Sequence, residues 1–250
     1  QTDATLGHTI CCPISATVNN AGLLVKSAGT GTTTFGMTAG GGLLVFNNTG
    51  TVDVQTGTLK LSGGGTSTGS FNVAAGATLD FGGGVQALNT AASITGASTS
   101  TVRISGGTLT LNSGSTYTAP ITNLSGGTLT VNSGATASTV GGTFSSGGLA
   151  GTGTFTVATA SGTYTWTGGT MSGTGTTAVP TGSTLTLSGS NDKILTTRTL
   201  TNAGTLTWTG TGNLAMNDGP VFTNQAGATF DIQTDATLGH TICCPISATV

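Results

Sequence analysis

The chain alternates apolar and small polar residues over many short segments. Leu-Thr-Leu at 109–111 and Thr-Leu-Thr-Val at 128–131 are examples. In an extended strand this alternation places aliphatic side chains on one face and threonines on the other. Thr and Val also favour strands, because a branched Cβ fits a pleated surface. No segment keeps the 3.6-residue apolar spacing of a helix over two turns. The pattern predicts an all-β protein of short strands.

A degenerate unit recurs along the chain, in which a glycine turn precedes one alternating strand. Successive units begin at Gly107 and Gly127, and again at Gly204 and Gly227, whereas a longer interval separates Gly22 from Gly50. Repeats of this length are typical of solenoids, in which each turn of the chain stacks on the one before it. We therefore expect a β-solenoid with coils of roughly 20–28 residues.

Tandem β-sandwich domains are the alternative fold. A sandwich needs a broad core in each domain of roughly 100 residues, and aromatic residues make up only 5% of this chain. A solenoid needs only a narrow aliphatic column inside each coil. It also stacks equivalent positions about 4.8 Å apart, which penalises like charges and favours Thr, Ser and Asn. The solenoid is the preferred prediction.

Composition narrows the possible functions. Charged residues are 5% of the chain, with 5 Lys and Arg, 7 acidic residues and a net charge of -2. Such a surface lacks the basic patch that nucleic acids require. No apolar run approaches the roughly 20 residues of a membrane-spanning helix. We expect no nucleic-acid partner and no membrane-spanning segment.

The same segment occurs at both ends of the sequence. The segment 1–18 is identical to the segment 233–250, so position 233 begins the sequence again. The prediction is one β-solenoid module at 1–232, followed at 233–250 by the start of an identical tandem module. A duplication of the segment introduced by cloning is the alternative. In a tandem array, Val250 would continue into a second Asn19-Asn20-Ala21-Gly22.

The Gly-Thr-Leu-Thr-Leu and Asn-Ala-Gly-Thr-Leu units, at 107–111 and 202–206, resemble the repeats of large bacterial surface proteins. The similar proteins are autotransporter passenger regions and filamentous-haemagglutinin-like adhesins. The resemblance spans most of the chain and is compositional. It implies a right-handed parallel β-helix that serves as a stalk, adhesin or matrix fibre outside the cell. The long exact repeat and the cysteines depart from that pattern.

Adjacent cysteines are the most unusual local feature. Cys11 and Cys12 recur as Cys243 and Cys244 because of the repeat. In an oxidising compartment they are candidates for a disulfide within a coil, between coils or between chains. A structural turn closed by Pro13 is the alternative. A zinc site with His8 would lack its fourth ligand within the module, so we expect no metal and no cofactor.

Catalytic groups are scarce. Asp53, Asp80 and Asp231 occur singly in strand-like segments, and we expect each to face water rather than to form an acid–base pair. No nucleophile elbow, phosphate-binding loop or calcium loop occurs in the sequence. We predict that the protein is not an enzyme.

Threonine and asparagine suggest two further kinds of site. Thr-x-Thr segments at 163–167 and 205–207 could order water or bind ice, although their variable spacing predicts that they do not lie in register on consecutive coils. Asn47 and Asn123 match the N-glycosylation pattern and are glycosylation candidates.

These observations favour a structural protein. The function hypothesis is a secreted, extracellular or cell-surface filament, stalk or sheath built from tandem β-solenoid modules. Its main partner would be itself, through end-to-end continuation and lateral packing, with glycans as a further possible partner. The alternative hypothesis is a surface adhesin that binds a glycan, a surface or ice along a solenoid stalk.

Overall fold

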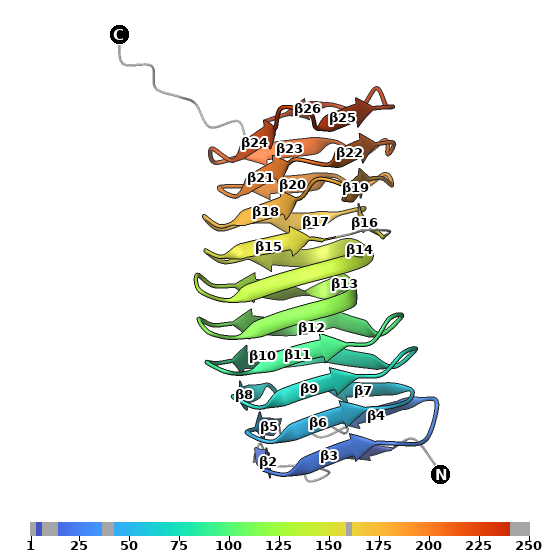
Figure 1. Cartoon of the computed structure of the whole chain (residues 1–250), viewed down its shortest axis with the longest axis vertical. Coiled ribbons are helices and arrows are strands. Elements are labelled where there is room, and N and C mark those ends of the chain that lie inside the picture. Colours follow the sequence, from blue (N-terminus) through green and yellow to red (C-terminus); the bar gives the residue numbers. More distant parts are fainter. Residues whose placement is uncertain (1–3, 7–14, 37–42, 159–161, 241–250) are drawn as a thin grey trace.

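The computed structural model describes residues 4–6, 15–36, 43–158 and 162–240. All regular elements in these ranges are β-strands, and every strand pairing is parallel. Successive turns stack along one axis, as Figure 1 shows, and the strand pairings divide the strands among three parallel faces, called sheets 1 to 3, that run along this axis. Strands on the near side run left to right and return behind as the chain climbs, so the coil is right-handed. The predicted β-solenoid is confirmed. None of the described residues belongs to a helix that could span a membrane.

Sheet 1 runs the full length of the rod. It contains, in axial order, β1 (Thr5–Leu6), β4 (Thr32–Phe35), β7 (Thr58–Leu61), the first part of β10 (Thr78–Leu88), the first part of β12 (Thr101–Leu111), the middle of β13 (Thr116–Val131), the middle of β14 (Thr136–Ala150), β16 (Thr163–Trp166), β19 (Thr184–Leu187), β22 (Thr205–Trp208) and β25 (Thr229–Ile232).

Sheet 2 follows sheet 1 along the chain in each turn. It contains β2 (Ala16–Asn20), β5 (Leu44–Asn48), β8 (Gly65–Ser67), the last parts of β10, β12, β13 and β14, β17 (Gly169–Met171), β20 (Lys193–Thr196), β23 (Leu214–Asn217) and β26 (Leu238–Gly239).

Sheet 3 completes each turn. It contains β3 (Leu23–Lys26), β6 (Thr51–Val54), β9 (Ser70–Val73), β11 (Ser93–Gly96), the first parts of β13 and β14, β15 (Thr154–Val157), β18 (Thr176–Val179), β21 (Thr199–Asn202) and β24 (Val221–Asn224).

The length of a turn varies while the pairing register is kept. The turn that brings Thr34 onto Thr5 is much longer than the turn that brings Phe155 onto Ala137. Extra residues therefore enter the corners between sheets rather than the strands. The corners need glycine where two rungs approach closely. Gly151, between β14 and β15, has φ +101°, and a Cβ there would lie 2.1 Å from the Val131 carbonyl oxygen of the adjacent rung.

The core is a single column of inward-facing side chains. Strands such as β7, β19 and β22 alternate outward and buried positions, as the period of two requires. Every aromatic residue of the chain belongs to this column or packs against it. The Phe144 ring stacks on the Trp166 ring of the next turn, with centroids 6.0 Å apart.

Asparagine ladders stabilise the corners, as the preference for uncharged polar residues indicates. Asn112 Nδ2 donates to Asn89 Oδ1 at 2.8 Å, and Asn132 Nδ2 donates to Asn112 Oδ1 at 2.9 Å. Similar amide pairs join other rungs, namely Asn20 with Asn48 and Asn202 with Asn224. Stacked amides can act as donor and acceptor at once, so identical residues attract across rungs where identical charges would repel.

Candidate functional site

The predicted cysteine site lies outside the described residues. Cys11, Cys12, Cys243 and Cys244 all fall in ranges that the structure does not describe, and so does His8. The disulfide or cross-link therefore stays a prediction. Among the residues that the structure does describe, no group of three or more His, Cys, Asp or Glu side chains could hold a metal ion.

The two glycosylation candidates lie within strands and take part in ladders. Asn47, in β5, donates through Nδ2 to Asn19 Oδ1 at 2.9 Å, and its Oδ1 accepts from the Thr66 amide at 3.0 Å. Asn123, in β13, accepts from the Thr143 amide at 2.9 Å. A glycan on either amide nitrogen would have to coexist with these contacts. Glycosylation stays a prediction at both positions.

The prediction that Asp80 faces water is wrong. Asp80 stands between two cations of sheet 1 and is fully buried. Its Oδ2 lies 2.8 Å from Arg103 Nη2 on the next rung and 3.9 Å from Lys60 Nζ on the previous rung. The hydrogen bond to Asp80 raises the pKa of Arg103. Charges are therefore tolerated in a column where their signs alternate. Asp53 and Asp231 do point outward and are partly exposed, as expected.

Arg198 is a buried cation that the sequence analysis did not identify. It is fully inaccessible, and its guanidinium donates to oxygen atoms from the two preceding turns. Nε donates to Thr177 Oγ1 at 2.9 Å, Nη2 to the Thr176 carbonyl at 2.9 Å and Nη1 to the Ser172 carbonyl at 3.1 Å. Longer bonds of 3.4 Å reach two glycine carbonyls at positions 151 and 153. Burial lowers the pKa of Arg198 to about 10, so the group stays charged at neutral pH.

Two lysines donate to carbonyls at other corners. Lys193 Nζ donates to the Asn191 carbonyl at 2.9 Å and to the Gly212 carbonyl at 3.4 Å. Burial lowers the pKa of Lys193, and the neighbouring Asp192 carboxylate opposes this effect. Lys26 Nζ donates to two carbonyls, at positions 28 and 29, each at 3.2 Å. Cationic side chains thus supply hydrogen-bond donors to backbone carbonyls in the corners.

These contacts account for all five Lys and Arg residues of the chain. Lys26, Lys193 and Arg198 are buried in corners, while Lys60 and Arg103 flank Asp80. The described exterior therefore presents mainly hydroxyls, methyls and amides, with a few carboxylates. A phosphate backbone requires several cations on one face. The described residues offer no such face, and the absence of a nucleic-acid partner stays a prediction.

Threonines of sheet 1 form a regular outward array over the last turns. Thr163, Thr184, Thr205 and Thr229 make one column, and Thr165, Thr186 and Thr207 make the second. The expectation that these segments are out of register is wrong, because the extra residues of each turn are placed in the corners. These strands turn their aromatic and aliphatic residues inward, so the outer face carries no ring and, before Asp231, no charge.

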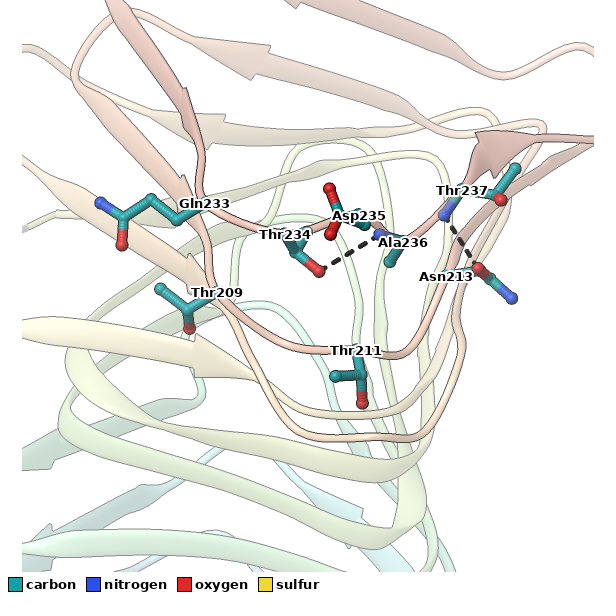
Figure 2. A pocket seen from close by; sticks show the side chains of 8 residues that line it. All are labelled: Thr209, Thr211, Asn213, Gln233, Thr234, Asp235, Ala236 and Thr237. Carbon is teal, nitrogen blue, oxygen red and sulfur yellow. Dashed lines mark hydrogen bonds between the residues drawn. The ribbon is translucent and has the colours of Figure 1, made fainter.

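A concavity of about 550 Å³ lies at the C-terminal end of the rod. Figure 2 shows that its walls come from two successive rungs, 209–213 and 233–237. The Thr237 amide donates to Asn213 Oδ1 at 2.9 Å, and the Ala236 amide donates to Thr234 Oγ1 at 3.2 Å. One carboxylate, Asp235, lines it. Among the described residues that line the concavity, no second ionisable group stands beside Asp235 to form an acid–base pair.

Comparison with protein-family models, with curated proteins and with solved structures gives no match to this chain.

Proposed function

We propose that the chain is a structural module of an extracellular or cell-surface filament, stalk or sheath in which β-solenoid modules follow one another in tandem. The supporting observation is the uninterrupted pairing of strands from one end of the rod to the other. The strands lie across the axis, so their hydrogen bonds run along it and resist extension. In such a rod only the two ends leave strand edges open.

The neutral exterior suits dense lateral packing. Rods with a large net charge repel one another, whereas this chain buries or pairs its five cations. Tandem continuation would cover the open strand edges at each end and leave threonine-rich sides for contacts between rods. The proposal accounts for the low charge and for the long exact repeat together.

Imaging of the native material tests this proposal. Gold-labelled antibodies against the chain, applied to intact cells that produce it, are expected to mark filaments along their length. Averaged images should show a spacing of about 4.8 Å along the filament axis, which is the separation of stacked parallel strands. Label confined to the cell interior, or label on isolated globular particles, would contradict the proposal.

A second function is favoured by the threonine array of sheet 1, which we propose as an adhesive face for an ordered water layer, ice being the simplest case. Alternate residues on one strand lie about 6.6 Å apart, and adjacent rungs lie about 4.8 Å apart. In tetrahedral water with O–H···O distances of about 2.75 Å, oxygens two hydrogen bonds apart are separated by about 4.5 Å. The rung spacing is close to that separation.

Replacing Thr186 with Arg tests the adhesive face. The residue is outward and central in the array, so the fold should tolerate the change while a bulky cation interrupts the flat surface. If the face binds ice, Thr186→Arg is expected to abolish inhibition of ice recrystallisation. Thr130→Arg, on the outward side of sheet 2, is the matched control and should leave it unchanged. Equal activity of the two variants, or no activity of the native chain, would exclude this function.

A further inference from the structure

The repeated segment pairs with different sheets at the two ends of the rod. Leu6 of the first copy pairs with Phe35, in sheet 1. Leu238 is the same residue in the second copy and pairs with Leu214, in sheet 2. The same sequence is therefore accepted by the edge of one sheet at the N-terminal end and by the edge of another at the C-terminal end.

These two partners lie on opposite sides of the segment. Phe35 belongs to the rung that follows Leu6, and Leu214 belongs to the rung that precedes Leu238. Leu6 is 49% exposed and Leu238 is 43% exposed, since each lacks the neighbour that the other has. We propose that tandem copies of this chain join into one continuous solenoid that rotates by one third of a turn at each junction, so that sheet 1 of each copy stacks on sheet 2 of the copy before it. This inference rests on the tandem array proposed above.

The asparagine ladders support this register. With the one-third rotation, β2 of the following copy lies on β24, with Val18 over Phe222 and Asn20 over Asn224. Val18 and Phe222 both pack against the core. Asn224 Oδ1 already accepts from the rung below at 2.7 Å, and Asn20 Nδ2 donates to the rung above at 2.8 Å. Asn224 can then donate to Asn20, and the amides form one ladder that runs in a single direction through the junction.

Sheet 3 of the following copy also fits the register given by the one-third rotation. Strand β3 of the following copy would lie on β25, with Leu24 over Phe230. Both of these residues pack against the core of the single chain, and each lies in the last rung of its own end. Apolar residues would therefore continue the core column across the junction on this side as well.

The turn lengths also allow the rotation. Three turns would cross the junction. They run over positions 214–238, over positions 222–250, which end at the second copy of Val18, and from Phe230 to the second copy of Leu24. All three are longer than the turn over positions 137–155 and shorter than the turn over positions 5–34, which the rod itself contains. The junction therefore needs no turn outside the range already found in the fold.

The rotation also brings two open concavities to the same corner. The one in Figure 2 lies at the corner between sheets 1 and 2 at the C-terminal end. A second concavity, of about 330 Å³, lies at the corner between sheets 3 and 1 at the N-terminal end, and its lining includes Lys26, Ser27 and Phe35. After a one-third rotation these corners are superimposed, so the loop after Lys26 would cover the segment 233–237. We therefore assign these concavities to the junction rather than to a small ligand.

Stacking without rotation gives a poorer junction. Strand β3 would then lie on β24, and Lys26 would follow Asn224 in the column, which ends the amide ladder. The repeated segment would also have to leave β23 to reach β25. With rotation, each copy advances the rod by about 50 Å, and the threonine array faces the same direction again only after three copies, about 150 Å along the axis.

Disulfide cross-linking in a chain of two copies tests the rotation. In this chain, Asn19 of a second full copy follows Val250, and the native cysteines are replaced by Ser. One variant carries Thr223→Cys in the first copy and Asn19→Cys in the second, the outward pair that the rotation places on adjacent strands. The comparison variant carries Thr223→Cys and, in the second copy, Val25→Cys, the outward pair for stacking without rotation. Adjacent strands place Cα atoms about 4.8 Å apart, within disulfide range.

The rotation predicts that the Asn19 variant cross-links about tenfold faster, or more, than the Val25 variant, because only the first pair is within reach. Faster cross-linking of the Val25 variant would overturn the rotation and leave a continuous tandem rod intact. Failure of both variants, with circular dichroism showing folded β-structure, would mean that copies do not stack, and it would contradict the tandem filament as well. All three substituted residues face outward in the single chain, which limits effects on folding.

Discussion

Replacing Arg198 with Met is expected to lower the free energy of unfolding by about 3 kcal/mol or more, because several buried acceptors lose their donor at once. The carbonyls of Ser172 and Thr176 and the hydroxyl of Thr177 accept from this guanidinium at 3.1 Å or less. Met has a similar length and fills much of the volume, so the loss reports mainly on the unpaired oxygens. Urea unfolding followed by far-ultraviolet circular dichroism measures the effect.

Two variants separate charge from geometry at this corner. Arg198→Lys keeps the charge but replaces the planar fork with a single ammonium, so it should reach fewer of the oxygens and fall between the native chain and the Met variant. Thr201→Ala, on the outward face of β21, the strand that follows Arg198, should stay within about 0.5 kcal/mol of the native chain. A Met variant as stable as the native chain would show that these hydrogen bonds add no net stability.

The alternation of inward and outward residues along the strand already predicts that Arg198 points inward. In the segment 198–202, Arg198 lies on the same face as Leu200 and Asn202, because side chains two residues apart point the same way in a strand. Leu200 and Asn202 are both buried, so the alternation that predicts the strand also places the arginine inside. What the sequence does not reveal is the set of carbonyls that accept from it. Gly151 and Ser172 come from earlier turns, and they reach this corner only because the number of residues in each turn stacks them there.

The fold class could be predicted because every short segment carries the same information. Alternation sets the inward face of each strand, glycines mark the corners, and the scarcity of charge follows from stacking equal positions at close range. The register of the threonine array could not be predicted from spacing. The interval from Thr205 to Thr229 is longer than the interval from Thr184 to Thr205, yet both pairs are adjacent in the sheet. The additional residues belong to corners, whose lengths the strand pattern leaves free.

Asp80 shows a second limit of local patterns. The prediction that Asp80 points outward is correct, since it alternates with the inward-facing Leu79 and Phe81. An outward side chain is nevertheless buried here, because Lys60 lies below it and Arg103 above it in the same column. These three charged residues come from three different turns and meet through register alone. The same register pairs or buries every cation, and over the rungs from β16 to β22 it leaves only hydroxyls and methyls on the outer face of sheet 1.

Truncating Trp166 to Ala is the other change with a large expected effect, a loss of about 3–5 kcal/mol in the free energy of unfolding. Trp166 is fully buried, stacks on Phe144 from the turn before and pairs in register with Leu187 of the turn after. Because each turn of a solenoid contacts mainly its two neighbours, the cavity weakens both interfaces of one rung. Urea unfolding measures the loss.

Trp166→Phe is the matched control, since it keeps a ring against Phe144 and removes an indole N–H that has no partner among the described residues. If the Ala variant unfolds at the same urea concentration as the Phe variant, the aromatic column does not hold adjacent turns together.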